Sequence, residues 1–96
     1  MPEPVACIDD TFEGYCDACE EHVRGTMTTG EFCMIEGKNI CVVGSVGTGD
    51  CGHTCQVAAG SAVWQIEGKP VARMGDPVSG TINGTITSGS DFVFTD

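Results

Sequence analysis

The sequence has few basic residues, few aromatic residues and no long apolar segment. Lysine and arginine together number 4 against 14 acidic residues, so the formal net charge is −10 at pH 7. A chain this acidic is repelled by nucleic-acid phosphates and anionic lipids, so we expect no nucleic-acid partner. No apolar run reaches the length of a membrane span, and the first residues lack the pattern of a signal peptide. We therefore expect synthesis in the cytoplasm.

Glycine, in contrast, is abundant. The 96 residues include 14 glycines and 4 prolines, which favours turns and short strands over a helical bundle. We expect one domain over residues 1–96, with a core so small that a metal, a disulfide or a partner has to support it. The 7 cysteines are an odd number without a signal peptide, which argues against a fully paired disulfide framework.

The chain contains about three copies of one unit of about 30 residues. Phe32–Ile40 resembles Val63–Val71, and both segments contain the triplet Glu-Gly-Lys. Three similar short segments also end in a glycine, namely Gly30, Gly60 and Gly89. Such periodicity indicates small supersecondary units that stack on one another. We place the repeats at about residues 4–39, 40–70 and 71–96.

Each copy has the pattern of short strands joined by tight turns. The triplets at 36–38 and 67–69 predict two hairpin turns. A third hairpin begins at Phe92–Phe94, and the chain ends before completing it. The segments at about 11–24, 46–54 and 77–83 are predicted to be loops. The predicted fold class is all-β.

Six candidate metal ligands lie in or next to two of these predicted loops: Cys16, Cys19, His22, Cys51, His53 and Cys55. Zinc binds four cysteine and histidine side chains, and pairs spaced by one to four residues suit its geometry. We expect a metal that cross-links the two loops and supplies folding free energy. The alternative is a set of free thiols and surface histidines. The remaining cysteines, Cys7, Cys33 and Cys41, lie in apolar runs and are interpreted as core side chains.

Two motifs that formally suggest an enzyme lack the structural context that they need. Cys16-x-x-Cys19 as a redox dithiol requires a helix N-terminus in an α/β fold, and no such pattern is present. Gly47–Gly52 matches G-x-G-x-x-G, but the residues after it favour a strand, where a dinucleotide site needs a helix. The sequence therefore predicts no catalytic residues and no enzyme.

Several segments resemble the PAAR-repeat proteins. Pro70–Asp76 (PVARMGD), followed by a loop and Gly84–Ser90 (GTITSGS), carries the resemblance most clearly. Degenerate copies occur at Pro4–Cys7 and Asn39–Val42, and Cys19–Thr26 is similar to the Cys-x-x-His approach to a strand in that family. The resemblance covers essentially the whole chain and lies in the order of the repeats.

This resemblance implies a small cone of β-hairpins with pseudo-three-fold symmetry and a metal near its apex. PAAR-repeat proteins are the tips of phage tails, type VI secretion systems and other contractile injection machines. One such tip caps a trimeric β-helical spike protein and touches the target membrane transiently during piercing. The location implied is the tip of a virion tail or of a secretion apparatus. The alternative function is a small intracellular zinc-binding adaptor or a redox protein.

The resemblance also selects a ligand set. Cys19 and His22 match the spacing of the family, and Cys51 and His53 occupy the corresponding place in the second copy. The expected ion is zinc, with iron as the alternative. We hold Cys16 and Cys55 in reserve, because Cys55 aligns with the start of a strand.

A docking base is expected at the end opposite the metal. The strands predicted at 26–29, 56–59 and 85–88 leave the metal-binding region and finish in the three repeated glycines. Three equivalent corners on one chain match three identical chains of a trimer. The predicted docking residues lie just beyond the glycines: Phe32, Ala62 and Ser90. The alternative is that these glycines only form tight turns.

Overall fold

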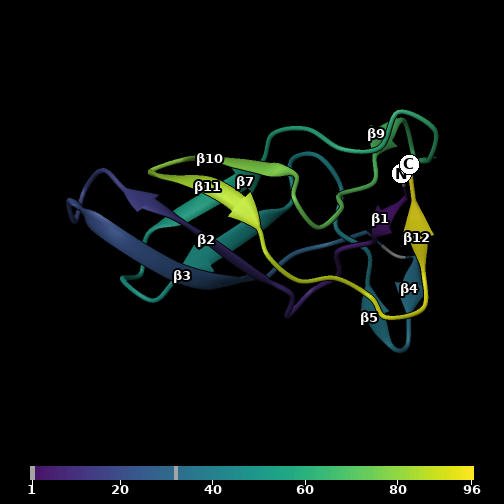
Figure 1. Ribbon diagram of the computed structural model, residues 1–96, viewed down its shortest axis with the longest axis horizontal. Helices are drawn as coiled ribbons and strands as arrows, with labels where there is room; N and C mark the ends of the chain where they lie inside the picture. The colour runs from purple at the N-terminus through teal and green to yellow at the C-terminus, as the bar shows by residue number, and fades with distance from the viewer. Residues whose placement is uncertain (1, 32) are drawn as a thin grey trace.

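Figure 1 shows a computed structural model, which describes residues 2–31 and 33–96. All regular elements among these residues are strands, so the predicted all-β class is confirmed. None of the described segments is a helix long and apolar enough to cross a membrane. The strands are β1 (Glu3–Pro4), β2 (Thr11–Cys16), β3 (Glu21–Met27), β4 (Met34–Ile35), β5 (Lys38–Asn39), β6 (Val46–Gly49), β7 (Thr54–Val57), β8 (Gln65–Ile66), β9 (Lys69–Pro70), β10 (Pro77–Gly80), β11 (Ile82–Ile86) and β12 (Phe94–Thr95).

Six strands form a closed antiparallel barrel in the order β10-β11-β2-β3-β6-β7. The barrel consists of three hairpins: β2–β3, β6–β7 and β10–β11. Its interior is filled by apolar side chains that are almost completely buried, among them Phe12, Met27, Val57, Ile82 and Ile86. Closure leaves no open edge in this sheet.

The barrel corrects the prediction that residues 11–24, 46–54 and 77–83 are loops. Along β2, Phe12 and Cys16 are buried while the residues between them alternate toward solvent, as in a strand with one buried face. The glycines that suggested loops allow strands to approach closely. A Cβ atom on Gly14 would lie 2.5 Å from the carbonyl oxygen of Asn83 on the neighbouring strand.

Three small two-stranded sheets form the other part of the molecule. Two of them, β4–β5 and β8–β9, are the predicted hairpins. In their turns both central residues have positive φ: 52° and 80° at Glu36-Gly37, and 52° and 81° at Glu67-Gly68. These values are typical of a type I′ turn.

The third small sheet corrects the prediction of an incomplete hairpin. β12 pairs with β1, with Glu3 opposite Thr95 and Pro4 opposite Phe94. The first strand of the chain therefore completes the hairpin that the last strand begins. Each repeat contributes one hairpin to the barrel. The three small sheets likewise number one for each repeat.

A ring of backbone hydrogen bonds marks the pseudo-three-fold axis. The amide of Ala6 donates to the carbonyl oxygen of Ala72, that of Ala72 to Cys41, and that of Cys41 to Ala6, each at 2.9 Å. All three residues are fully buried. Three isolated β-bridges repeat the same relation around the ring: Val5↔Arg73, Cys7↔Ile40 and Val42↔Val71.

The molecule is elongated, with extents of 35 × 24 × 23 Å. Figure 1 shows the barrel at one end and the three small sheets at the other. We call the end formed by β1–β12, β4–β5 and β8–β9 the base. The opposite end, formed by the turns of the three barrel hairpins, is called the tip.

Candidate metal centre

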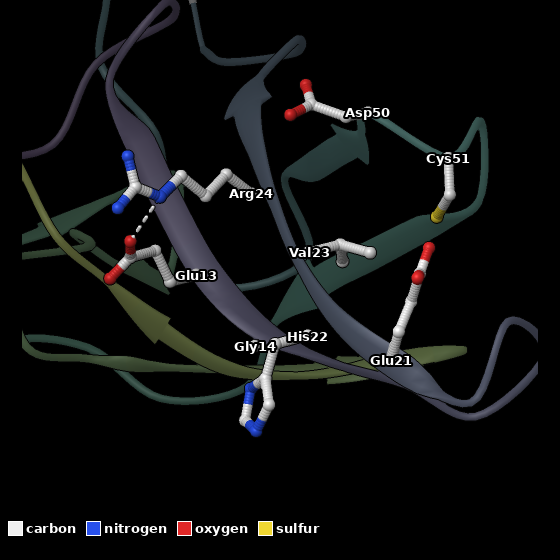
Figure 2. Close-up of a pocket in the computed structure, with 8 residues that line it drawn as sticks. All are labelled: Glu13, Gly14, Glu21, His22, Val23, Arg24, Asp50 and Cys51. Carbon is white, nitrogen blue, oxygen red and sulfur yellow. Dashed lines mark ion pairs between the residues drawn. The ribbon is translucent and has the colours of Figure 1, made fainter.

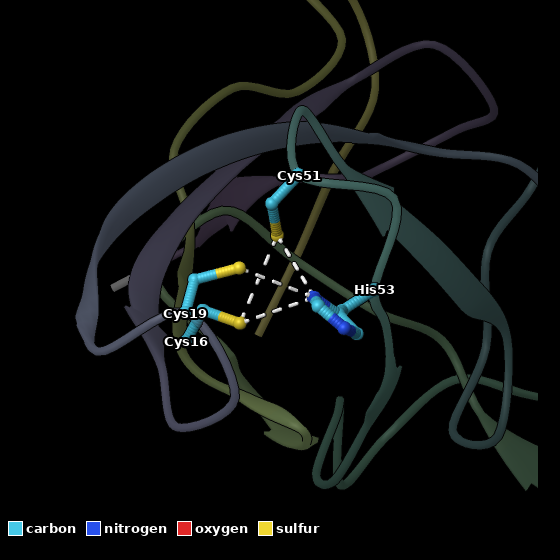
Figure 3. Close-up of side chains that lie close together, drawn as sticks. All are labelled: Cys16, Cys19, Cys51 and His53. Carbon is cyan, nitrogen blue, oxygen red and sulfur yellow. Dashed lines mark hydrogen bonds between the residues drawn. The ribbon is translucent and has the colours of Figure 1, made fainter.

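Four potential metal ligands meet at the tip. Cys16 lies at the end of β2, Cys19 in the turn after it, and Cys51 and His53 in the turn between β6 and β7. Their donor atoms all lie within 4.8 Å of one another. Figure 3 shows the three sulfur atoms and the imidazole ring directed toward one common point. The cluster therefore spans two hairpins that are distant in sequence.

Local backbone structure explains why these side chains converge. The side chain of Cys16 continues the buried face of β2, and this residue is fully buried. The β6–β7 turn is tight: the amide of Gly49 bonds to the His53 carbonyl oxygen at 2.8 Å, and Gly52 has a φ of 86°. This left-handed glycine lets the chain reverse between Cys51 and His53, so both reach the same side of the turn.

The distances fit a single tetrahedral ion. Nδ1 of His53 lies 3.5 Å from the Cys16 sulfur and 3.4 Å from the sulfurs of Cys19 and Cys51. The Cys51 and Cys16 sulfurs are 3.7 Å apart. Zinc bonds of about 2.3 Å to sulfur and about 2.0 Å to nitrogen at tetrahedral angles would separate two sulfurs by about 3.8 Å and a sulfur from a nitrogen by about 3.5 Å. These four residues can therefore hold a metal ion.

The electrostatics of the cluster also favour a cation. Burial, followed by the neighbouring thiols of Cys16 and Cys51, raises the pKa of Cys19 to about 12. Burial opposes ionisation of Cys16 as well, but hydrogen bonds from the Cys19 amide and the Cys51 thiol outweigh it and lower the pKa of Cys16. The site thus holds one negative charge readily and resists a second. A divalent cation removes this conflict, because it stabilises several thiolates together.

The sequence placed Cys19, Cys51 and His53 in the expected ligand set, and the structure brings these three together. The fourth position is occupied by Cys16, which had been held in reserve. The expected ligand His22 lies elsewhere. It is opposite Tyr15 in the β2–β3 register, and its ring meets the Tyr15 ring edge-on with 5.6 Å between centroids.

Strand alternation explains this exchange. Tyr15 faces outward from the barrel and its cross-strand partner His22 faces outward with it, whereas Cys16 faces inward. The other reserve residue, Cys55, is buried on β7 opposite Gly47 and lies outside the cluster. The alternation of apolar residues from Phe12 to Cys16 was the signal that could have selected Cys16 from the sequence.

The third barrel hairpin supports the cluster without providing a ligand. The carbonyl oxygen of Thr81, between β10 and β11, accepts a hydrogen bond of 3.0 Å from the amide of Asp17. The Asn83 side chain caps the same turn by donating to the Gly80 carbonyl oxygen at 3.1 Å. The β2–β3 turn is thereby bonded to the β10–β11 turn.

Comparison with known proteins agrees with this architecture. A family model of the PAAR motif matches residues 18–81, which are 64 of the 96 residues. The chain belongs to the PAAR-motif family. No curated protein matches it. The PAAR motif supports a spike-tip role in contractile systems, and the family is structural rather than enzymatic. The predicted PAAR fold, with a Cys/His cluster at one end, is confirmed.

The base of this PAAR protein presents apolar side chains to solvent. Val63 and Phe92 are 73% and 72% exposed, and Met34 and Phe94 are also exposed. Of the predicted docking residues, Ala62 is exposed and Phe32 lies outside the described residues. Ser90 is half-buried, and its hydroxyl accepts hydrogen bonds of 3.1 Å from the amides of Phe92 and Val93. These two bonds fix the backbone of the turn that follows Ser90.

The repeated glycines in front of these corners are sites of close backbone approach. A Cβ atom on Gly30 would lie 2.8 Å from the Ile40 carbonyl oxygen, and one on Gly60 would lie 2.6 Å from that of Val71. On Gly89 it would lie 2.7 Å from the Pro4 side chain. These glycines let the chain pass from the barrel to the base against the strands near the axis.

Proposed function

We propose that this chain is the tip of the spike of a contractile injection machine, in a phage tail or a bacterial secretion apparatus. One copy caps one trimeric β-helical spike protein, and its hairpin turns point toward the target membrane, which they touch only during piercing. Residues 1–96 act as one PAAR unit. The role is mechanical, with no catalytic residues.

The observation that carries this proposal is the pseudo-three-fold arrangement of the base. Its three small sheets surround the ring formed by Ala6, Cys41 and Ala72. Equivalent positions after Gly60 and Gly89 present Val63 and Phe92 to solvent. A monomer with three similar faces can make three similar contacts on a trimer without breaking the symmetry of that trimer. Apolar side chains at such contacts supply affinity when they become buried.

We further propose zinc as the ion at the tip, held by Cys16, Cys19, Cys51 and His53. Three thiolates and one imidazole form a donor set typical of structural zinc, and closed four-coordinate sites leave no position for a substrate. The ion would join the β2–β3 turn to the β6–β7 turn. Such a link stiffens the part of the molecule that meets resistance first, and it adds folding free energy to a small core.

The experiment is to mix the protein with a soluble trimeric fragment of a β-helical spike from a contractile machine and to measure the mass of the complex. We expect one chain per trimer. The double variant Val63→Asp/Phe92→Asp should abolish binding, because it places charges in the buried contact. The matched control is Tyr15→Asp, which changes an exposed aromatic residue of the barrel and should bind normally.

Three results would contradict the proposal. A stoichiometry of three chains per trimer would mean that the pseudo-symmetry is not used for docking. Equal binding by the double variant and the parent would place the docking surface elsewhere. The absence of any complex with spike fragments would instead favour a zinc-binding adaptor.

A further inference from the structure

Cys51 of the cluster borders a cavity that opens to solvent. The cavity has a volume of about 610 Å³ and is lined mainly by residues of β2, β3 and the β6–β7 turn. Figure 2 shows the Cys51 sulfur and the Glu21 carboxylate directed toward one another, while the His22 ring is directed away. The neighbouring Cys16, in contrast, is fully buried. Cys19 is half-buried like Cys51 but does not line this cavity, so Cys51 is the thiol that a small solute reaches from it and Cys16 is one that it does not.

These two thiols already touch. The Cys51 and Cys16 sulfurs are 3.7 Å apart, joined by a thiol–thiol hydrogen bond. A disulfide needs a sulfur–sulfur distance of about 2.0 Å, so the sulfurs have to approach by about 1.7 Å. The β6–β7 turn carries Cys51 next to Gly52 at the end of its hairpin, and such turns absorb small displacements more easily than strands do.

We propose that Cys51 is a site of reversible oxidation, and that peroxide converts Cys51 and Cys16 into a disulfide joining the same two hairpins as the metal. Release of the ion rests on the metal site proposed above, whereas formation of the disulfide does not. The oxidised tip would keep its cross-link between hairpins after losing the ion.

The chemistry balances with hydrogen peroxide as the oxidant. The Cys51 thiolate attacks one peroxide oxygen, the O–O bond breaks, and Cys51 becomes a sulfenic acid while one water leaves after protonation. The Cys16 thiolate then attacks the Cys51 sulfur, the S–O bond breaks, and a second water leaves. In total, two thiols and one peroxide give one disulfide and two waters. Any metal ion loses two of its four ligands in this step.

The charge around the cavity determines which oxidants reach the sulfur. Glu13 forms an ion pair with Arg24 at 2.6 Å. Among the described residues that line the cavity, the three carboxylates of Glu13, Glu21 and Asp50 outnumber the single arginine. Negative charge at the entrance repels anionic oxidants such as oxidised glutathione and does not affect neutral peroxide. We therefore expect peroxide to react about tenfold faster than oxidised glutathione at low salt.

The test treats the purified protein with hydrogen peroxide or with oxidised glutathione. A chromophoric chelator reports released metal, and thiols are counted after denaturation. Because trypsin cuts after Arg24 and Lys38, a bond between Cys16 and Cys51 links two peptides that dithiothreitol separates again. We expect the loss of two thiols, the release of one metal ion and this peptide pair. Glu21→Gln/Asp50→Asn should remove the preference for peroxide.

Variants identify the sulfurs. Cys51→Ser should not form the linked peptides, whereas Cys19→Ser should still form them, and Cys33→Ser, which alters an exposed thiol outside the cluster, should behave like the parent. Thiols that resist peroxide until the protein unfolds would overturn the proposal, as would a bond between Cys16 and Cys19. If the protein contains no metal, the peptide analysis still decides the disulfide, and only the proposed metal site fails.

Discussion

The amide of Ala6 donates a hydrogen bond of 2.9 Å to the carbonyl oxygen of Ala72, and the same relation recurs twice around the pseudo-three-fold axis. At this axis three segments from three repeats meet, and the side chain of each ring residue is fully buried. Two of the three are alanines, and the third is Cys41. The ring is therefore the place where the three repeats depend most directly on one another.

The loss of stability caused by a substitution in the ring should depend on the size of the new side chain. Ala72→Leu adds bulk at the axis and should lower the free energy of unfolding by about 1–3 kcal/mol. Cys41→Ala is the matched control. It removes only a sulfur whose hydrogen bond to the Thr29 carbonyl oxygen is long, at 3.4 Å, and should cost less than about 1 kcal/mol. Urea unfolding measures both, and equal losses would contradict close packing at the axis.

Removal of the metal should destabilise the protein strongly. A structural ion supplies folding free energy in a small domain, so a chelator should lower the melting temperature by about 10 °C or more. His53→Ala should have the same effect and should abolish metal binding. His22→Ala is the control, because this ring packs on Tyr15 outside the cluster. Elemental analysis should find one metal ion per chain in the control, and loss of the metal there would return His22 to the ligand set.

Backbone strain differs between equivalent turns of the three repeats. Asp9 has a φ of 77°, where the corresponding residues Gly44 and Gly75 have 94° and 92°. Asp9→Gly should therefore be neutral or stabilise by up to about 1 kcal/mol, because its surface contact with Lys38 at 4.0 Å contributes little. Gly75→Ala should cost about 1–2 kcal/mol although a Cβ atom there meets nothing within 4 Å. Thermal and urea unfolding of both variants test this difference, and a stable Gly75→Ala protein would contradict it.

Stability should fall at alkaline pH. Burial, followed by the charge of Asp10, raises the pKa of Cys7 from 9.0 to about 11, and burial raises that of Cys41 to about 12. Above pH 9 these thiols ionise in the unfolded chain and keep their protons in the folded one. The unfolded state then binds fewer protons, so each of the two thiols lowers the free energy of unfolding by up to about 1.4 kcal/mol per pH unit until about pH 11. Cys7→Ala/Cys41→Ala should flatten this decline in urea unfolding between pH 8 and 11, and an unchanged slope would exclude these thiols.

The sequence predicted the features that depend on local pattern. The Glu-Gly turns, the all-β class and the resemblance of the repeats to the PAAR family could each be inferred from a short run of residues. Features that depend on contacts between distant parts of the chain could not be inferred in this way. No local pattern indicates that Glu3 pairs with Thr95, because this contact joins residues from opposite ends of the chain.

The candidate metal centre shows the same difference between features set by local pattern and features set by distant contacts. The sequence showed that the candidate ligands are mostly thiols and that they come from two separate segments. The choice between Cys16 and His22 depended on recognising residues 11–16 as a strand, and Gly14 in the middle of this segment concealed it. A glycine in a barrel strand allows close contact with a neighbouring backbone, but in sequence it has the same appearance as a glycine in a loop.

The unequal hairpins have a consequence for imaging. Two turns at the tip carry the candidate metal ligands, and the third, at Thr81 between Gly80 and Ile82, carries no cysteine or histidine. A chain of this kind can seat on a three-fold spike in three orientations that differ by 120° and contact the trimer in nearly the same way. Image reconstruction with imposed three-fold symmetry would average three different turns into one and reduce the metal density to about one third at each position. Reconstruction without symmetry, or after classification of orientations, would be needed to see this tip.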